Sequence, residues 1–159
     1  MNQQPMSQPG MQGSGSWSDT PPPGIKGVSD APMIGAPLTD SDAKMWGMLA
    51  QLSVLIGTFF AIFGWVGPLI IYLVYHDRNR FVRYQAAEAL NGAISVFVLN
   101  IAIFIAGTIL TIVSFGLLSF ALFLVYIPGI VQMVFAIVAA VKANNGIWWN
   151  YPVNLRLMK

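Results

Sequence analysis

Residues 75–91 read YHDRNRFVRYQAAEALN, and this short charged stretch separates two long apolar parts of the chain. Residues 45–75 contain no Asp, Glu, Lys or Arg, and neither do residues 89–141. Uncharged apolar runs longer than about 18 residues are typical of transmembrane helices. The sequence therefore predicts an all-α fold, a polytopic membrane helical bundle.

The first apolar run favours two short helices. As one helix, residues 45–75 would be about 46 Å long, more than a ~30 Å hydrocarbon core but less than two full spans. Gly67 and Pro68 interrupt the run, because proline lacks a donor and glycine loosens the backbone. We expect helices at about 44–63 and 68–75 with the break at Gly67–Pro68. A single kinked helix is the alternative.

The second apolar run predicts two more helices. Residues 89–141 would extend about 80 Å as one helix, so the run must cross the bilayer twice. The sequence SFGLLS at residues 114–119 supplies a turn with Gly116. We expect helices at about 82–113 and 117–142, with a kink in the last one at Pro128.

The two ends of the chain differ from these runs. Residues 1–43 hold seven of the ten prolines and six glycines, which predicts a disordered tail ahead of a membrane domain at 44–159. In residues 147–159, apolar Val153, Leu155 and Leu157 alternate with polar Asn154 and Arg156. This alternation favours a short segment along the bilayer surface, one side in lipid and the other in water.

Basic residues predict the orientation. Basic residues flank the second apolar run on both sides, whereas the expected turn at 114–119 has no basic residue. The residues that we expect to determine the topology are Arg78, Arg80, Arg83 and Lys142. The positive-inside rule then places both basic segments in the cytoplasm. We expect a protein of the bacterial inner membrane with cytoplasmic N- and C-termini.

Composition excludes several classes of function. Charged residues make up 9% of the chain, against about 25% in soluble domains, and the net charge of +2 does not favour nucleic acid. There is no cysteine. The only histidine is His76, and the sequence has no recognisable nucleophile for which it could act as a general base. We expect no catalytic residue, cofactor, metal or small-molecule substrate. The expected partners are the lipid bilayer and other membrane proteins or a second copy.

One polar stripe is the candidate site. Its members recur at spacings of four, three and four residues on one helix face: Tyr84, Glu88, Asn91 and Ser95. An ionisable side chain near the bilayer suggests a functional groove for an ion, a substrate or another chain. The alternative is that Glu88 pairs with Arg83, Arg80 or Lys142 and locks helix ends together.

Two segments support a family resemblance. GPLIIYLVYHDRNRFVRYQAAEALN at 67–91 and AAVKANNGIWWNYPVNLRLMK at 139–159 resemble a bacterial membrane family, domain of unknown function 4870, similar to the Tic-twenty-like import component of chloroplast envelopes. The resemblance covers residues 43–159 and implies four helical segments in a membrane. The family pattern has an acidic residue and a histidine before EALN, where this chain has Arg83, Tyr84 and Gln85.

These observations favour a non-catalytic scaffold, accessory or interaction protein. The alternative is a Tic-twenty-like channel or translocation component, with a polar path lined by Glu88, Asn91, Ser95 and Gln132. An intramembrane enzyme ranks last, because the sequence lacks a nucleophile–base pair.

Overall fold

The computed structural model describes residues 20–59, 63–152 and 154–158, and within these ranges every regular element is a helix. The expected all-α architecture with four α-helices is therefore confirmed. A short 3-10 helix, η1, precedes the last of them. The elements in chain order are α1 (Asp40–Phe59), α2 (Val66–Tyr75), α3 (Arg80–Val113), η1 (Ser119–Val125) and α4 (Tyr126–Asn144).

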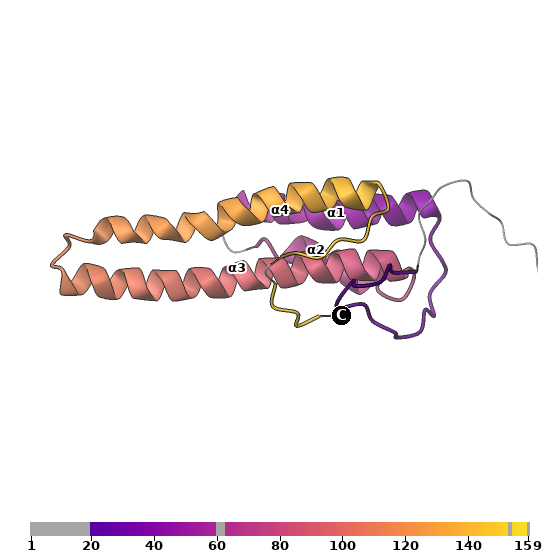
Figure 1. The fold of residues 1–159 in the computed structure, drawn as a ribbon, viewed down its shortest axis with the longest axis horizontal. Coiled ribbons are helices and arrows are strands. Elements are labelled where there is room, and N and C mark those ends of the chain that lie inside the picture. The colour runs from indigo at the N-terminus through magenta and orange to yellow at the C-terminus, as the bar shows by residue number, and fades with distance from the viewer. Residues whose placement is uncertain (1–19, 60–62, 153, 159) are drawn as a thin grey trace, which may run out of the picture.

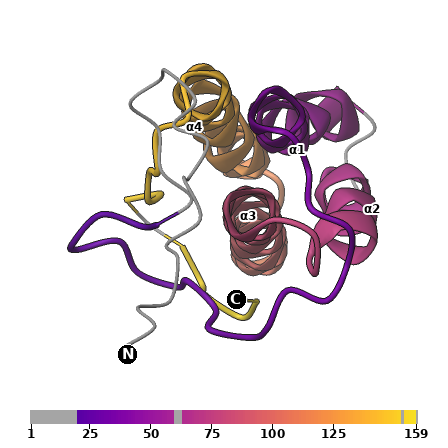
Figure 2. The same ribbon diagram turned by 90° about the vertical axis from the view of Figure 1, so that its right-hand side faces the viewer.

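Helix α3 is the central element of the fold. It contacts α1, α2, η1 and α4, and in the end-on view these helices lie along one side of it (Figure 2). Asn79 caps its N-terminus by accepting a hydrogen bond from the Val82 amide at 3.1 Å. Small residues allow close packing, since Ala89 of α3 meets Val54 of α1 and Ala136 of α4 in one cluster.

The molecule has two parts along its length (Figure 1). We call one the head, which contains α1, α2, residues 80–93 of α3 and residues 132–144 of α4. The other is the hairpin, residues 94–131, in which the rest of α3 pairs with η1 and the start of α4. The turn of the hairpin lies where we expected it, and Gly116 there has a φ of 90°.

Two prolines begin helices instead of interrupting them. Helix α2 starts at Val66 and α4 starts at Tyr126, each two residues before its proline. Proline fits the first helical turn, where its missing N–H has no partner to lose. The expected break at Gly67–Pro68 therefore lies earlier in the chain, and η1 replaces the expected continuous helix kinked at Pro128.

Only two helical stretches in the described chain are long and apolar enough to span a bilayer, Arg80–Val113 and Ser119–Asn144. Few of the residues in their most apolar windows are buried within the protein, which distinguishes them from the core helices of a soluble domain. Helix α2 has 10 residues and would extend only about 15 Å. The four helices therefore include two candidate spans.

The described part of the expected tail lies against the head. The Gly35 amide donates to the Asp77 carbonyl at 3.0 Å, and Arg83 Nη1 donates to the Ala31 carbonyl at 3.1 Å. Asp30 lies 3.7 Å from Arg80. These contacts hold residues 20–39 in place although their composition predicts disorder, while residues 1–19 lie outside the described ranges.

Candidate functional site

The polar stripe of α3 faces the C-terminal segment of the same chain. After α4, Gly146 adopts a φ of 71° and the Ile147 amide donates back to the Lys142 carbonyl at 2.9 Å. This turn sends the chain back along α3, as Figure 1 shows. We call residues 147–152 and 154–158 the strap.

Glu88 is the centre of the contact between α3 and the strap. Its side chain is 2% exposed, and its Oε1 accepts from Arg156 Nε at 3.1 Å. Its Oε2 accepts from Asn154 Nδ2 at 2.8 Å and from the Tyr151 amide at 3.3 Å. Three donors from the strap therefore satisfy one buried carboxylate. The alternative pairing of Glu88 with Arg83, Arg80 or Lys142 is wrong, because the chain returns along α3 and brings Arg156 to it.

Asn91 binds the end of the strap through its side-chain amide. Its Oδ1 accepts from the Leu157 and Met158 amides at 3.0 and 2.8 Å, and its Nδ2 donates to the Met158 carbonyl at 2.8 Å. An extended segment without a neighbouring strand needs such partners for its backbone groups. Asn91 therefore supplies to Met158 the hydrogen bonds that a paired strand would supply.

Ser95 and Tyr84 hold the strap on either side of these two residues. Ser95 Oγ accepts from the Leu155 amide at 2.7 Å and donates to the Asn91 carbonyl at 2.7 Å. Tyr84 Oη donates to the Trp149 carbonyl at 2.9 Å. All four members of the stripe thus bind one segment, and their polar atoms are engaged within the chain.

A second buried network links the strap to α1. Tyr151 Oη donates to Gln51 Oε1 at 2.7 Å, and Gln51 Nε2 donates to Gln85 Oε1 at 3.0 Å. Gln85 Nε2 completes the path at the Ile147 carbonyl, 3.2 Å away. Burial, with the nearby Glu88 carboxylate, raises the pKa of the Tyr151 phenol above its ordinary value. Tyr151 therefore stays protonated and donates to Gln51.

Five residues of the site were not predicted from the sequence: Gln51, Gln85, Tyr151, Asn154 and Arg156. The available signal was the alternation of the C-terminal segment, which places Asn154 and Arg156 on the same side. We expected that side to face water, and in the structure it faces the stripe, while Leu155 and Leu157 are exposed. Gln51 carries a second signal, because it is a polar residue in the middle of an uncharged apolar run.

The basic residues surround the head in different ways. Arg83 is buried, and its Nε donates to the His76 carbonyl, so it is not part of a solvated turn. Arg78 lies 5.8 Å from the Tyr75 ring centre, and Lys142 lies 5.9 Å from that of Trp149. His76 stacks on Tyr72.

Within the described chain, no three His, Cys, Asp or Glu residues lie close enough together to hold a metal ion.

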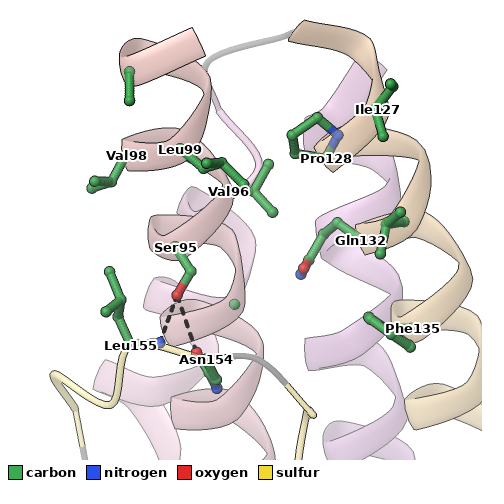
Figure 3. Close-up of a pocket in the computed structure, with 13 residues that line it drawn as sticks. Ser95, Val96, Val98, Leu99, Ile127, Pro128, Gln132, Phe135, Asn154 and Leu155 are labelled. Carbon is green, nitrogen blue, oxygen red and sulfur yellow. Dashed lines mark hydrogen bonds between the residues drawn. The ribbon is translucent and has the colours of Figure 1, made fainter. Parts of the chain in front are cut away.

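Gln132 lies apart from the strap contacts, in a groove of about 590 Å³ between α3 and α4 (Figure 3). Ser95 also lines this groove, whereas Glu88 and Asn91 do not. The four residues therefore do not line one common path. The expected polar path through these four residues is therefore wrong, since the strap occupies the polar face that would have carried it.

The fold and site define a class: an integral membrane protein with a membrane hairpin and a head closed by its own C-terminus. The profile of the MamF/MmsF family, the magnetosome magnetite crystal formation protein family, matches residues 42–158. The chain therefore belongs to the MamF/MmsF family. No curated protein and no solved structure matches the chain.

This match corrects the family expected from the sequence. The segments at 67–91 and 139–159 had suggested domain of unknown function 4870 and a Tic-twenty-like protein. All of the first and all but the last residue of the second lie inside the MamF/MmsF match. Positions 83–85 already departed from the expected pattern, and in the structure they serve this chain's own contacts. Arg83 binds residues 31 and 76, while Tyr84 and Gln85 bind the strap.

Proposed function

We propose that this chain is a non-catalytic accessory protein of the magnetosome membrane that takes part in magnetite crystal formation. The observation that carries the proposal is the family match over residues 42–158, which covers the head, the hairpin and the strap together. An accessory role requires a stable membrane-bound shape that other components can recognise. It requires no reactive group.

The contacts of the polar stripe support a scaffold. Glu88, Asn91 and Ser95 use their polar atoms to fix the strap, so none of the three is directed toward an outside ligand. Fully satisfied buried polar networks rigidify a structure and select one arrangement of it. The head therefore presents a fixed surface at one end of the membrane hairpin.

The head is proposed to lie on the cytoplasmic side, with both chain ends. Arg78, Arg80, Arg83 and Lys142 all lie at the head, whereas the hairpin turn at residues 114–118 carries no charge. This distribution agrees with the positive-inside rule. Partners would then be other proteins of the same membrane, or a second copy, that contact the head from the cytoplasm.

The test is complementation in a magnetosome-forming strain that lacks its MamF/MmsF proteins. We expect the chain to be recovered with magnetosome membranes and to restore the size distribution of the magnetite crystals in electron micrographs. A Glu88→Ala chain should insert into the membrane but restore crystal size poorly, because its strap is released. The proposal is overturned if membranes contain the chain and the crystals match those of the strain without it.

The orientation has a separate test. A protease site placed in the segment before α1 should be cleaved in magnetosomes isolated with an intact membrane, because that segment would face outward. Cleavage only after the membrane is opened with detergent would reverse the proposed orientation and leave the accessory role standing.

A further inference from the structure

The groove beside Gln132 lies where the head meets the hairpin. Its walls come from Leu99 and Ala102 of α3 and from Ile127 and Val131 of α4, and its floor is formed in part by Asn154 of the strap. Figure 3 shows the side chain of Gln132 directed from α4 toward α3 across this space. The lining is almost entirely apolar, with few polar groups, as is typical of small-ligand sites.

The groove is continuous with the lipid-facing surface. Leu99, Ile127 and Val131 are each about half exposed, on the two stretches that are apolar and long enough to span the bilayer. From Ser95 to Val113, α3 rises about 27 Å, close to a ~30 Å hydrocarbon core. The groove therefore lies near the head-side border of that core, and the molecules that can enter it come from the bilayer.

The side-chain N–H group of Gln132 finds no acceptor in the part of the chain that the structure describes. Its side chain is 5% exposed, and its Nε2 has no acceptor among the described residues. Gly92 gives it room, because a Cβ at that position would lie 2.9 Å from Nε2. A buried N–H without an acceptor is costly, most of all at membrane depth, where water cannot replace the partner. The groove thus needs an acceptor from a molecule that is otherwise apolar.

We propose that the groove binds one glycerophospholipid of the head-side leaflet. An acyl chain lies between Leu99, Ile127 and Val131, and an ester carbonyl oxygen accepts the hydrogen bond of Gln132 Nε2. Ester carbonyls lie at the border between headgroups and hydrocarbon, the level at which Gln132 is found. A groove of about 590 Å³ suits a small ligand, whereas a helix of a second copy has a diameter of about 10 Å and would need a broader surface.

The experiment uses the full chain reconstituted in phosphatidylcholine bilayers that contain a trace of phosphatidylcholine with a diazirine on one acyl chain. Illumination and mass spectrometry locate the labelled residues. We expect labelling concentrated on residues 99–102 and 127–131. As the bulk lipid, diester phosphatidylcholine should compete with the labelled lipid about three- to tenfold better than its diether analogue, which lacks the ester carbonyl, as expected for one hydrogen bond.

Three variants test the hydrogen bond to the ester and the binding of the acyl chain separately. Gln132→Leu removes the donor and should make diester and diether lipids equal competitors while the labelling pattern stays. Ala102→Phe fills the groove and should reduce labelling of residues 127–131 several-fold. Ala106→Phe places the same side chain about one turn further along α3, at an exposed residue outside the groove, and should leave the labelling unchanged.

Three results would overturn the proposal. The first is equal competition by diester and diether lipids in the unaltered chain. The second is labelling spread evenly along both spans and insensitive to Ala102→Phe, which would indicate bulk lipid only. The third is crosslinking of residues 99 or 131 to a second protein chain, which would make the groove an interface between copies.

Discussion

The two halves of α3 have opposite surroundings although they form one continuous helix. In the first half, every residue from Phe81 to Ala93 is buried, including Arg83, Gln85 and Glu88. In the second half, residues 94–113, only Gly107 is buried and the large aliphatic side chains face outward. In the head, polar groups are inside and hydrogen-bonded, whereas in the hairpin apolar groups are outside because the surrounding medium is lipid.

The comparison shows that burial alone does not define the core of this protein. The exposed half of α3 is the more apolar half, and the buried half contains the only glutamate of the chain. Such a residue is tolerated because the strap brings three donors to it. Without the strap, the first half of α3 would expose a polar stripe at the border of the bilayer.

The largest expected effect follows from removing Glu88. Glu88→Ala leaves Arg156, Asn154 Nδ2 and the Tyr151 amide without their acceptor, and breaking a buried ion pair of this kind costs about 3–5 kcal/mol. We expect the strap to be released while the hairpin stays in the membrane. Trypsin cleavage after Arg156 and hydrogen exchange of the Leu155 and Leu157 amides would both accelerate.

Glu88→Gln is the matched control for this prediction. It keeps an acceptor of the same shape but loses the charge, so the acceleration should be intermediate. If Glu88→Ala left the strap as protected as in the unaltered chain, the remaining contacts, such as those of Tyr84, Asn91 and Ser95, would be sufficient to hold the strap.

The sequence located one side of this contact and missed the other. The stripe could be predicted because Tyr84, Glu88, Asn91 and Ser95 lie on one helix and periodicity is a local property. Their partners lie 59 to 68 residues further along the chain, as the pairs Ser95–Asn154 and Glu88–Arg156 show, and no local pattern encodes that distance. The wrong pairing of Glu88 arose from choosing among cations at the expected helix ends, because nothing in the sequence showed that the chain returns along α3 and brings Arg156 to Glu88.

The helices were predicted well where the signal is length and less well where it depends on proline. Uncharged runs indicated both halves of the hairpin, and Gly116 indicated its turn. A proline, in contrast, is compatible with a kink and with the first turn of a new helix, and the sequence does not distinguish the two. Pro68 and Pro128 both proved to be in the first turns of helices.

Two asparagines give the sharpest test of the difference between the halves. Asn91 lies in the head half of α3 and makes three hydrogen bonds to residues 157 and 158. Asn100 lies in the hairpin half, and its Oδ1 is buried without a partner in the described chain. The same side chain should therefore stabilise the first half and destabilise the second.

We expect Asn91→Ala to weaken the end of the strap by about 2–3 kcal/mol, the value of a few hydrogen bonds, and Asn100→Leu to be neutral or stabilising by about 1 kcal/mol. Hydrogen exchange of the Leu157 and Met158 amides would report the first change, and the thermal unfolding midpoint in lipid would report the second. A loss of stability in Asn100→Leu would show that the hairpin half also depends on a polar contact.

The smallest expected effect concerns the phenol of Tyr151 and the pH. Its pKa in the folded chain is raised above the ordinary value of 10.0, by burial first and by Glu88 second, so the folded state favours the protonated form. The stability that this preference contributes is complete below pH 10 and is lost as the pH rises through the folded pKa. Between these values the Tyr151 phenol stays protonated and the strap should stay bound.

Phenolate absorbance measures this directly. Near pH 11 in lipid, the unaltered chain and Tyr151→Phe should show equal absorbance, because Tyr151 has not yet ionised, and they should differ by one phenolate only at higher pH. In denaturant, the difference should already be present near pH 11.

Tyr151→Phe also leaves Gln51 Oε1 without its donor and should cost about 1 kcal/mol at neutral pH. Tyr151 bonds to Gln51 of α1 and to Glu88 in the first half of α3. The lipid-facing part of the hairpin should therefore be unaffected by the substitution, and a shift in its hydrogen exchange would show that the two halves of α3 are coupled.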